Sequence, residues 1–202
     1  MTTWSWTLAL MLSLAAVRPT SGQSFADVRK LYDAGQYEQV VSAAHDDQQL
    51  RMTYLAALSQ QKLSHQDDAR KLYERLAARD ESDPWRDVGR SALALLAGNI
   101  PEAVESADRA VAKGDSLPEA HFQRGLALNL QQDMAGAAAA FDKASQIDPE
   151  WAYAHYYAGL LYSKAKRVDL TASHFDRFLK LAPQAPERAE VQSIMRTLSG
   201  RR

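Results

Sequence analysis

Two histidines, His121 and His155, are separated by an interval of about 34 residues that recurs along the chain. If the chain repeats with that period, both stack on adjacent helices, where they could bind a metal ion or sense pH. No carboxylate or further histidine joins them in that register, and His45, His65 and His174 show no ligand spacing. Because two ligands make an incomplete metal site, we expect packing roles for the pair and no bound metal.

The motifs that usually carry catalysis are missing from the sequence. It contains no HExxH, GxxxxGK[ST], GxSxG or GxGxxG, which removes the usual carriers of metal, phosphate, acyl and dinucleotide chemistry. It also contains no cysteine, so thiolate metal sites, disulfides and cysteine nucleophiles are excluded. We therefore expect neither enzymatic activity nor a cofactor.

The composition describes a globular or repeat protein. The 202 residues include 24 Lys and Arg against 25 Asp and Glu, and 46% are hydrophobic. Counterion release on nucleic acid needs a positive surplus that a net charge of -1 does not provide, so no nucleic acid partner is expected. The alternating charges of residues 66–81 are typical of a solvated helix face.

The amino terminus has the pattern of an export signal. Residues 7–17 form an uncharged apolar run that is too short for a membrane span. Thr20 and Gly22 stand three and one residues before a possible cut ahead of Gln23. We expect residues 1–22 to be a cleaved signal peptide, which leaves a periplasmic or secreted protein with no membrane insertion. Because no Lys or Arg precedes the run, an uncleaved membrane anchor and a buried first helix stay open as alternatives.

The rest of the chain repeats with a period of about 34 residues. Three pairs of landmarks keep this spacing: Gly125 and Gly159, Phe141 and Phe175, Pro149 and Pro183. The same offset carries Ala69 to Ala103 and Ala103 to Ala137. Each copy contains two runs of apolar residues with helical spacing, separated by a short polar break. This pattern predicts two antiparallel helices per copy and no strands.

These residues resemble the tetratricopeptide repeat, a helix-turn-helix unit of about 34 residues. The matching positions are Gly35, Ala57, Ala69, Gly98, Ala103, Gly125, Ala137, Phe141, Pro149, Gly159, Phe175 and Pro183. The resemblance implies an all-α superhelical solenoid over residues 23–183. Its repeats are about 23–49 (degenerate), 50–83, 84–117, 118–151 and 152–185, followed by a capping helix at 186–198 and a disordered tail at 199–202.

The turns inside the repeats differ from one another in sequence. Gly35 and Gly98 stand where positive φ lets a helix end without a Cβ penalty. Gln132 and Lys166 occupy positions where the family often has glycine. We expect those two turns to close with another geometry or to carry modest strain.

In proteins of this family the first helices of successive repeats line a concave groove that holds a segment of a partner. Placed in that frame, the inward residues are Arg51, Tyr54, Leu58, Trp85, Val88, Phe122, Tyr153, Tyr156 and Leu160. Aromatic side chains dominate binding hot spots, so this lining suits an apolar or aromatic peptide. The alternative is that several inward residues, especially Leu160 and Phe122 together with Leu126 on the same face, pack between helices. Apolar residues such as Val88 and Ala92 in the inward slots disfavour a clamp for a terminal carboxylate.

The resemblance therefore predicts a non-enzymatic, exported scaffold that binds a peptide segment of another protein in its groove. A solenoid that uses the same aromatic side chains to bind a small ligand or a glycan is the alternative. A homo-oligomer, in which another copy fills the groove, is a third possibility.

Overall fold

The structure is a computed structural model that describes residues 23–44 and 49–200. The predicted signal peptide, His45 and the last two residues of the tail lie outside the described residues. The part described contains eleven helices and no strands. The helices are α1 (Phe25–Asp33), α2 (Tyr37–Ala43), α3 (Leu50–Lys62), α4 (Gln66–Ala77), α5 (Pro84–Leu96), α6 (Ile100–Lys113), α7 (Pro118–Leu130), α8 (Met134–Ile147), α9 (Ala152–Lys164), α10 (Val168–Leu181) and α11 (Arg188–Ser199).

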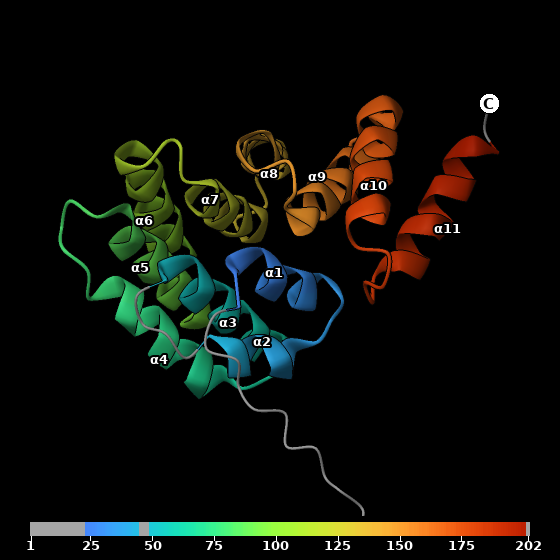
Figure 1. The fold of residues 1–202 in the computed structure, drawn as a ribbon. Helices are drawn as coiled ribbons and strands as arrows, with labels where there is room; N and C mark the ends of the chain where they lie inside the picture. Colours follow the sequence, from blue (N-terminus) through green and yellow to red (C-terminus); the bar gives the residue numbers. More distant parts are fainter. Residues whose placement is uncertain (1–22, 45–48, 201–202) are drawn as a thin grey trace, which may run out of the picture.

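The first ten helices form five pairs that pack one after another. The second helix of each pair contacts both its partner and the first helix of the next pair, and α10 packs against α11 in the same way. Figure 1 shows the pairs following an arc from α1 to α11. The predicted all-α solenoid of about five repeats with a final helix is confirmed. In the described part of the chain, no helix combines the length and the apolar character needed to cross a bilayer.

Side chains just before several helices satisfy the free N–H groups of the first turn. Asp83 accepts a hydrogen bond from the backbone N–H of Trp85, and Pro84 occupies the first helical position, where no N–H is needed. Asp133 accepts from the N–H of Gly136 at 2.9 Å. These caps explain why α5 and α8 begin where they do.

Glycine allows neighbouring helices to approach closely. A Cβ at Gly125 would lie 2.8 Å from the ring of Phe141, and one at Gly159 would lie 2.6 Å from the ring of Phe175. Gly89, which the repeat pattern does not single out, makes the tightest of these three contacts. Its Cβ would lie 2.5 Å from the backbone nitrogen of Ala77. Any side chain at these glycines would overpack the interface between helices.

The turns inside all five repeats place one residue in the left-handed region. Gly35 and Gly98 have φ of 74° and 73°, whereas Ser64, Gln132 and Lys166 adopt φ of 63°, 70° and 58°. The expectation of another geometry at Gln132 and Lys166 is wrong, because both adopt the same left-handed φ as the glycines. A side chain in this region costs roughly 1–2 kcal/mol, because Cβ approaches the following carbonyl oxygen.

The strain in these turns can be measured with a matched pair of variants. Gln132→Gly removes the Cβ clash and adds chain entropy to the unfolded state, so we expect a net gain of about 0.5–1 kcal/mol in the free energy of unfolding. Gly98→Gln should lose a similar amount, since a Cβ at Gly98 meets nothing within 4 Å and only the backbone angle matters. Urea unfolding checks both, and a loss of stability in Gln132→Gly contradicts the interpretation.

Candidate binding surface on the inner face

A cavity of about 370 Å³ lies on the inner face of the solenoid. The first helices α3, α5 and α7 supply most of its wall, and α1, α4 and α9 each add one tyrosine. The lining residues are Tyr32, Leu58, Gln61, Lys62, Tyr73, Ala92, Leu95, Phe122, Gln123, Leu126, Asn129, Leu130 and Tyr157. We call this space the inner cavity.

The inner cavity combines an apolar wall with a few polar groups. Leu58, Leu95 and Leu126 present alkyl groups, whereas Lys62 and Asn129 bring polar atoms. Burial opposes the charge of Lys62, but Tyr157 and Glu187 raise the pKa of its amine above the ordinary value. The cavity therefore holds a cation, which forms an ion pair with Glu187 at 3.1 Å.

Most of the predicted groove residues are buried in the structure. The buried ones are Tyr54, Leu58, Trp85, Val88, Phe122, Tyr153 and Tyr156, whereas Arg51 and Leu160 are half-buried. Of the nine, only Leu58 and Phe122 line the inner cavity. The aromatic rings of this set therefore pack against other side chains.

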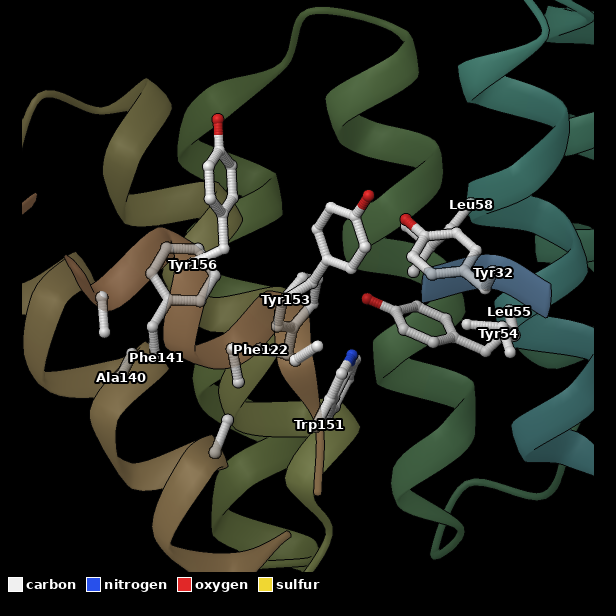
Figure 2. Packing of buried hydrophobic residues seen from close by; sticks show 14 of the residues in the cluster. Tyr32, Tyr54, Leu55, Leu58, Phe122, Ala140, Phe141, Trp151, Tyr153 and Tyr156 are labelled. Atoms are coloured by element: carbon white, nitrogen blue, oxygen red, sulfur yellow. The ribbon is translucent and has the colours of Figure 1, made fainter. Parts of the chain in front are cut away.

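The inward aromatic rings contact one another across the inner face. Phe122 stacks on Trp151 with centroids 4.4 Å apart, and Tyr32 meets Tyr153 edge to face at 5.0 Å. Tyr54 donates a hydrogen bond from its hydroxyl to Gln123 at 2.8 Å. Figure 2 shows Tyr32, Tyr54 and Tyr153 gathered at this surface. Aromatic pairs of this geometry add stability beyond the area that they bury.

Helix α1 covers part of the inner face. Its Arg29 donates a hydrogen bond to Asp148 at 2.7 Å, across 119 positions of the sequence. The turn that follows α1 reaches the link before α11, where a Cβ at Gly35 would lie 2.8 Å from Cγ of Pro186. In Figure 1 α1 lies inside the arc, between α3 and α9. Tyr153 of the predicted groove is buried partly because Tyr32 of α1 packs against its ring.

A network of charges lies beneath α1. Arg51 donates hydrogen bonds to Glu119 and to Asp148, which also accepts from Arg29. Asp33, at the end of α1, has 6% of its surface exposed, and one of its carboxylate oxygens has no hydrogen-bond partner. Burial raises the pKa of Asp33 to about 7, against the attraction of Arg29.

Two histidines that share no register in the repeat, His155 and His174, lie next to each other in the structure. His155 and His174 approach through their Nδ1 atoms at 3.1 Å, and Nε2 of His174 lies 3.3 Å from Asp142. Burial lowers the pKa of both imidazoles. His174, which shows no ligand spacing in the sequence, thus has a histidine and a carboxylate as neighbours. Among the described residues, no group of three or more ligating side chains is arranged to hold a metal ion.

Several residues of the inner cavity were not predicted to point inward, among them Tyr32, Gln61, Gln123, Leu130 and Tyr157. Gln123 and Tyr157 occupy equivalent positions in adjacent repeats, and each follows a predicted inward aromatic residue. The period itself was therefore a signal for these two. No comparable signal existed for Tyr32, because its approach depends on the curvature of the whole solenoid.

The comparisons with known proteins agree with this geometry. The family model described as tetratricopeptide repeat matches residues 54–118 and 89–150. The chain is a tetratricopeptide repeat protein. No curated protein sequence matches it.

Solved structures show the same fold as this tetratricopeptide repeat protein. TTC0263 from Thermus thermophilus is 19% identical, with a TM-score of 0.61 over 83% of this chain and 95% of that one. MamA is 17% identical, with a TM-score of 0.50 over 79% and 95%. The first tetratricopeptide domain of Spaghetti (RPAP3), solved with the HSP90 peptide SRMEEVD, is 16% identical, with a TM-score of 0.52 over 60% and 97%. At these identities the likeness shows the fold alone.

The raised pKa of Asp33 makes the stability of this tetratricopeptide repeat protein depend on pH. An acid whose pKa is higher in the folded chain favours folding while it is protonated, and this contribution is lost as the pH rises from about 4 to 7. Asp33→Asn mimics the protonated acid. We expect similar stability for the variant and the wild type near pH 4, and a variant more stable by about 2–4 kcal/mol at pH 8.

Urea unfolding of both proteins across this pH range measures the difference. Other buried carboxylates, such as Glu119, are present in both proteins and cancel. A difference in stability that stays constant with pH contradicts an ionising Asp33.

Proposed function

We propose that this tetratricopeptide repeat protein is a non-enzymatic scaffold that binds a peptide segment of a partner protein on its inner face. The observation that carries the proposal is the inner cavity, which opens among the first helices and has an apolar wall with a few polar groups. An apolar side chain of the peptide would enter the cavity. Its amide groups would face Gln61, Lys62 and Asn129.

The family and the fold support this role. Tetratricopeptide repeat proteins are generally scaffolds for protein interaction, and one solved structure with the same fold contains a bound peptide. The inward positions of this chain differ from a clamp for a terminal carboxylate, because Val88, Ala92 and Phe122 are apolar. We therefore propose an internal peptide segment with a large apolar anchor. Of the residues predicted to line the groove, Leu58 and Phe122 line the inner cavity directly. The others support it as packed side chains.

A small apolar ligand or a glycan is the second candidate. The volume of the inner cavity, about 370 Å³, falls within the range of small-molecule pockets, roughly 300–1,000 Å³. A thermal-shift screen with saccharides and apolar compounds separates the candidates, since a ligand that binds only the folded state raises the melting temperature.

Site-specific photocrosslinking tests peptide binding. A photoreactive residue in place of Leu130, which lines the inner cavity and is 51% exposed, should crosslink to one segment of one partner in the native cell. The same residue in place of Ala139, exposed on α8, is the matched control and should capture no such segment.

A second substitution connects capture to the cavity. Leu126→Trp should fill the space and reduce crosslinking from position 130 at least about tenfold, because a volume change at a close-packed anchor site costs more than about 1.4 kcal/mol. Far-UV circular dichroism should show unchanged helicity. Equal capture from positions 130 and 139, or full capture in the Leu126→Trp variant, contradicts the proposal.

We also propose export, on the basis of the apolar run at residues 7–17 and the small residues before Gln23. Intact-mass and amino-terminal analysis of the protein from its native cell should give a chain that begins at Gln23. A chain that retains residues 1–22 in the membrane fraction supports the uncleaved anchor, and one that retains them in the cytoplasm rules out export.

A further inference from the structure

The contacts of α1 are unusual for a solenoid. In such a fold each repeat contacts only its neighbours. The first repeat does contact its neighbour α3, but it also reaches Asp148 after α8, Tyr153 on α9 and Pro186 before α11. These three residues belong to the fourth repeat, the fifth repeat and the segment beyond it. Helix α1 therefore lies across the inner face of the solenoid.

The residues of α1 that face the solenoid follow the spacing of a helix bound in a groove. Phe25 lies under the guanidinium of Arg51, with 4.1 Å to the ring centroid. Val28 is fully buried, Arg29 pairs with Asp148 and Tyr32 is also buried. These positions are i, i+3, i+4 and i+7, which is the anchor pattern of an amphipathic helix in a groove.

The surface that receives α1 consists of Arg51, Asp148, Tyr153 and Pro186, and we call it the α1-binding surface. We propose that it is the docking site for one helix of the partner, and that α1 occupies it until that helix displaces it. The partner helix carries an aromatic residue, an aliphatic residue, an arginine and a second aromatic residue at i, i+3, i+4 and i+7. The existence of a partner rests on the proposed function.

Charge complementarity selects this occupant. Asp148 lies where α1 ends its first turn and accepts hydrogen bonds from both Arg29 and Arg51. A displacing helix without a cation at i+4 would leave this half-buried carboxylate with one partner fewer, and loss of a charged hydrogen bond in such a place is costly. A helix with an acidic residue at i+4 would be rejected.

Two features make α1 displaceable. It has nine residues, fewer than the roughly 12–15 that an isolated helix needs for marginal stability, so its position depends on the α1-binding surface. Its last residue, Asp33, is a buried carboxylate with an oxygen that has no partner. A partner helix that lacks an acid at this position, i+8, avoids that cost and competes favourably.

A peptide added in trans tests the proposal with the full chain. The peptide covers residues 24–34 and keeps Ser24, which caps α1 through the N–H of Asp27. In the wild type the tethered α1 excludes it, because a tethered segment has an effective concentration near the millimolar range. In Gly35→Val the new side chain collides with Pro186 and shifts α1. We expect fluorescence anisotropy to show the peptide binding this variant at least about tenfold more tightly than the wild type.

Matched controls separate displacement from general destabilisation. Gly98→Val introduces the same side chain at the same positive φ, with nothing within 4 Å, so it should bind the peptide as weakly as the wild type. A peptide that carries Val28→Asp and Tyr32→Asp should bind none of the proteins. Hydrogen exchange should accelerate in α1 of Gly35→Val and stay unchanged in α7 to α9.

A second variant keeps the test decisive if Gly35→Val fails to fold. Arg29→Ala removes the ion pair to Asp148 and leaves the α1-binding surface unchanged, so it should also bind the peptide more tightly than the wild type. Equal peptide affinity in all variants, or α1 amides as protected in Gly35→Val as in Gly98→Val, overturns the proposal. If photocrosslinking at position 130 still captures a partner segment in that event, the proposed function stands and only the displacement of α1 fails.

Discussion

A pair of helices has apolar side chains on more faces than its two members can cover for each other, so each pair in this chain needs the next one. Within a repeat, Gly125 and Gly159 allow the two helices to pack closely, because they let a phenylalanine ring of one helix lie against the backbone of the other. Between repeats, Gly89 lets α5 lie close to the backbone of α4 at Ala77 and Tyr73. The resulting close packing sets how far each pair rotates from the last. The curvature that follows brings the first repeat opposite the fourth and the fifth.

The local order of the fold could be predicted because it repeats. The period identifies which residues are neighbours in successive layers, and Gly125, Phe141 and their counterparts one repeat later meet as the pattern indicates. The turn geometry was harder to predict. A left-handed residue is expected from glycine, yet Gln132 and Lys166 adopt the same φ without it. Packing of the helices on either side overrides the preference of a single residue.

The contacts that shape the binding surface could not be predicted from the period. Arg29 and Asp148 are separated by 119 positions, and their contact depends on small rotations summed over three repeats. Of the residues predicted to point inward from the first helices, Leu58 and Phe122 line the inner cavity. The spacing of apolar residues does not indicate that α1 crosses the same face, where it contacts Tyr153 and Asp148.

The charges beneath α1 are unequal in number, and this inequality bears on function. Two cations, Arg29 and Arg51, lie among three carboxylates, those of Asp33, Asp148 and Glu119. Both Asp33 and Glu119 retain a buried oxygen without a partner, a cost that a chain selected only for stability would remove with one apolar substitution. Local conflicts of this kind persist where a site must accommodate a second arrangement. The surplus carboxylate thus favours an inner face that binds α1 less tightly than it could, and so leaves room for a competing helix.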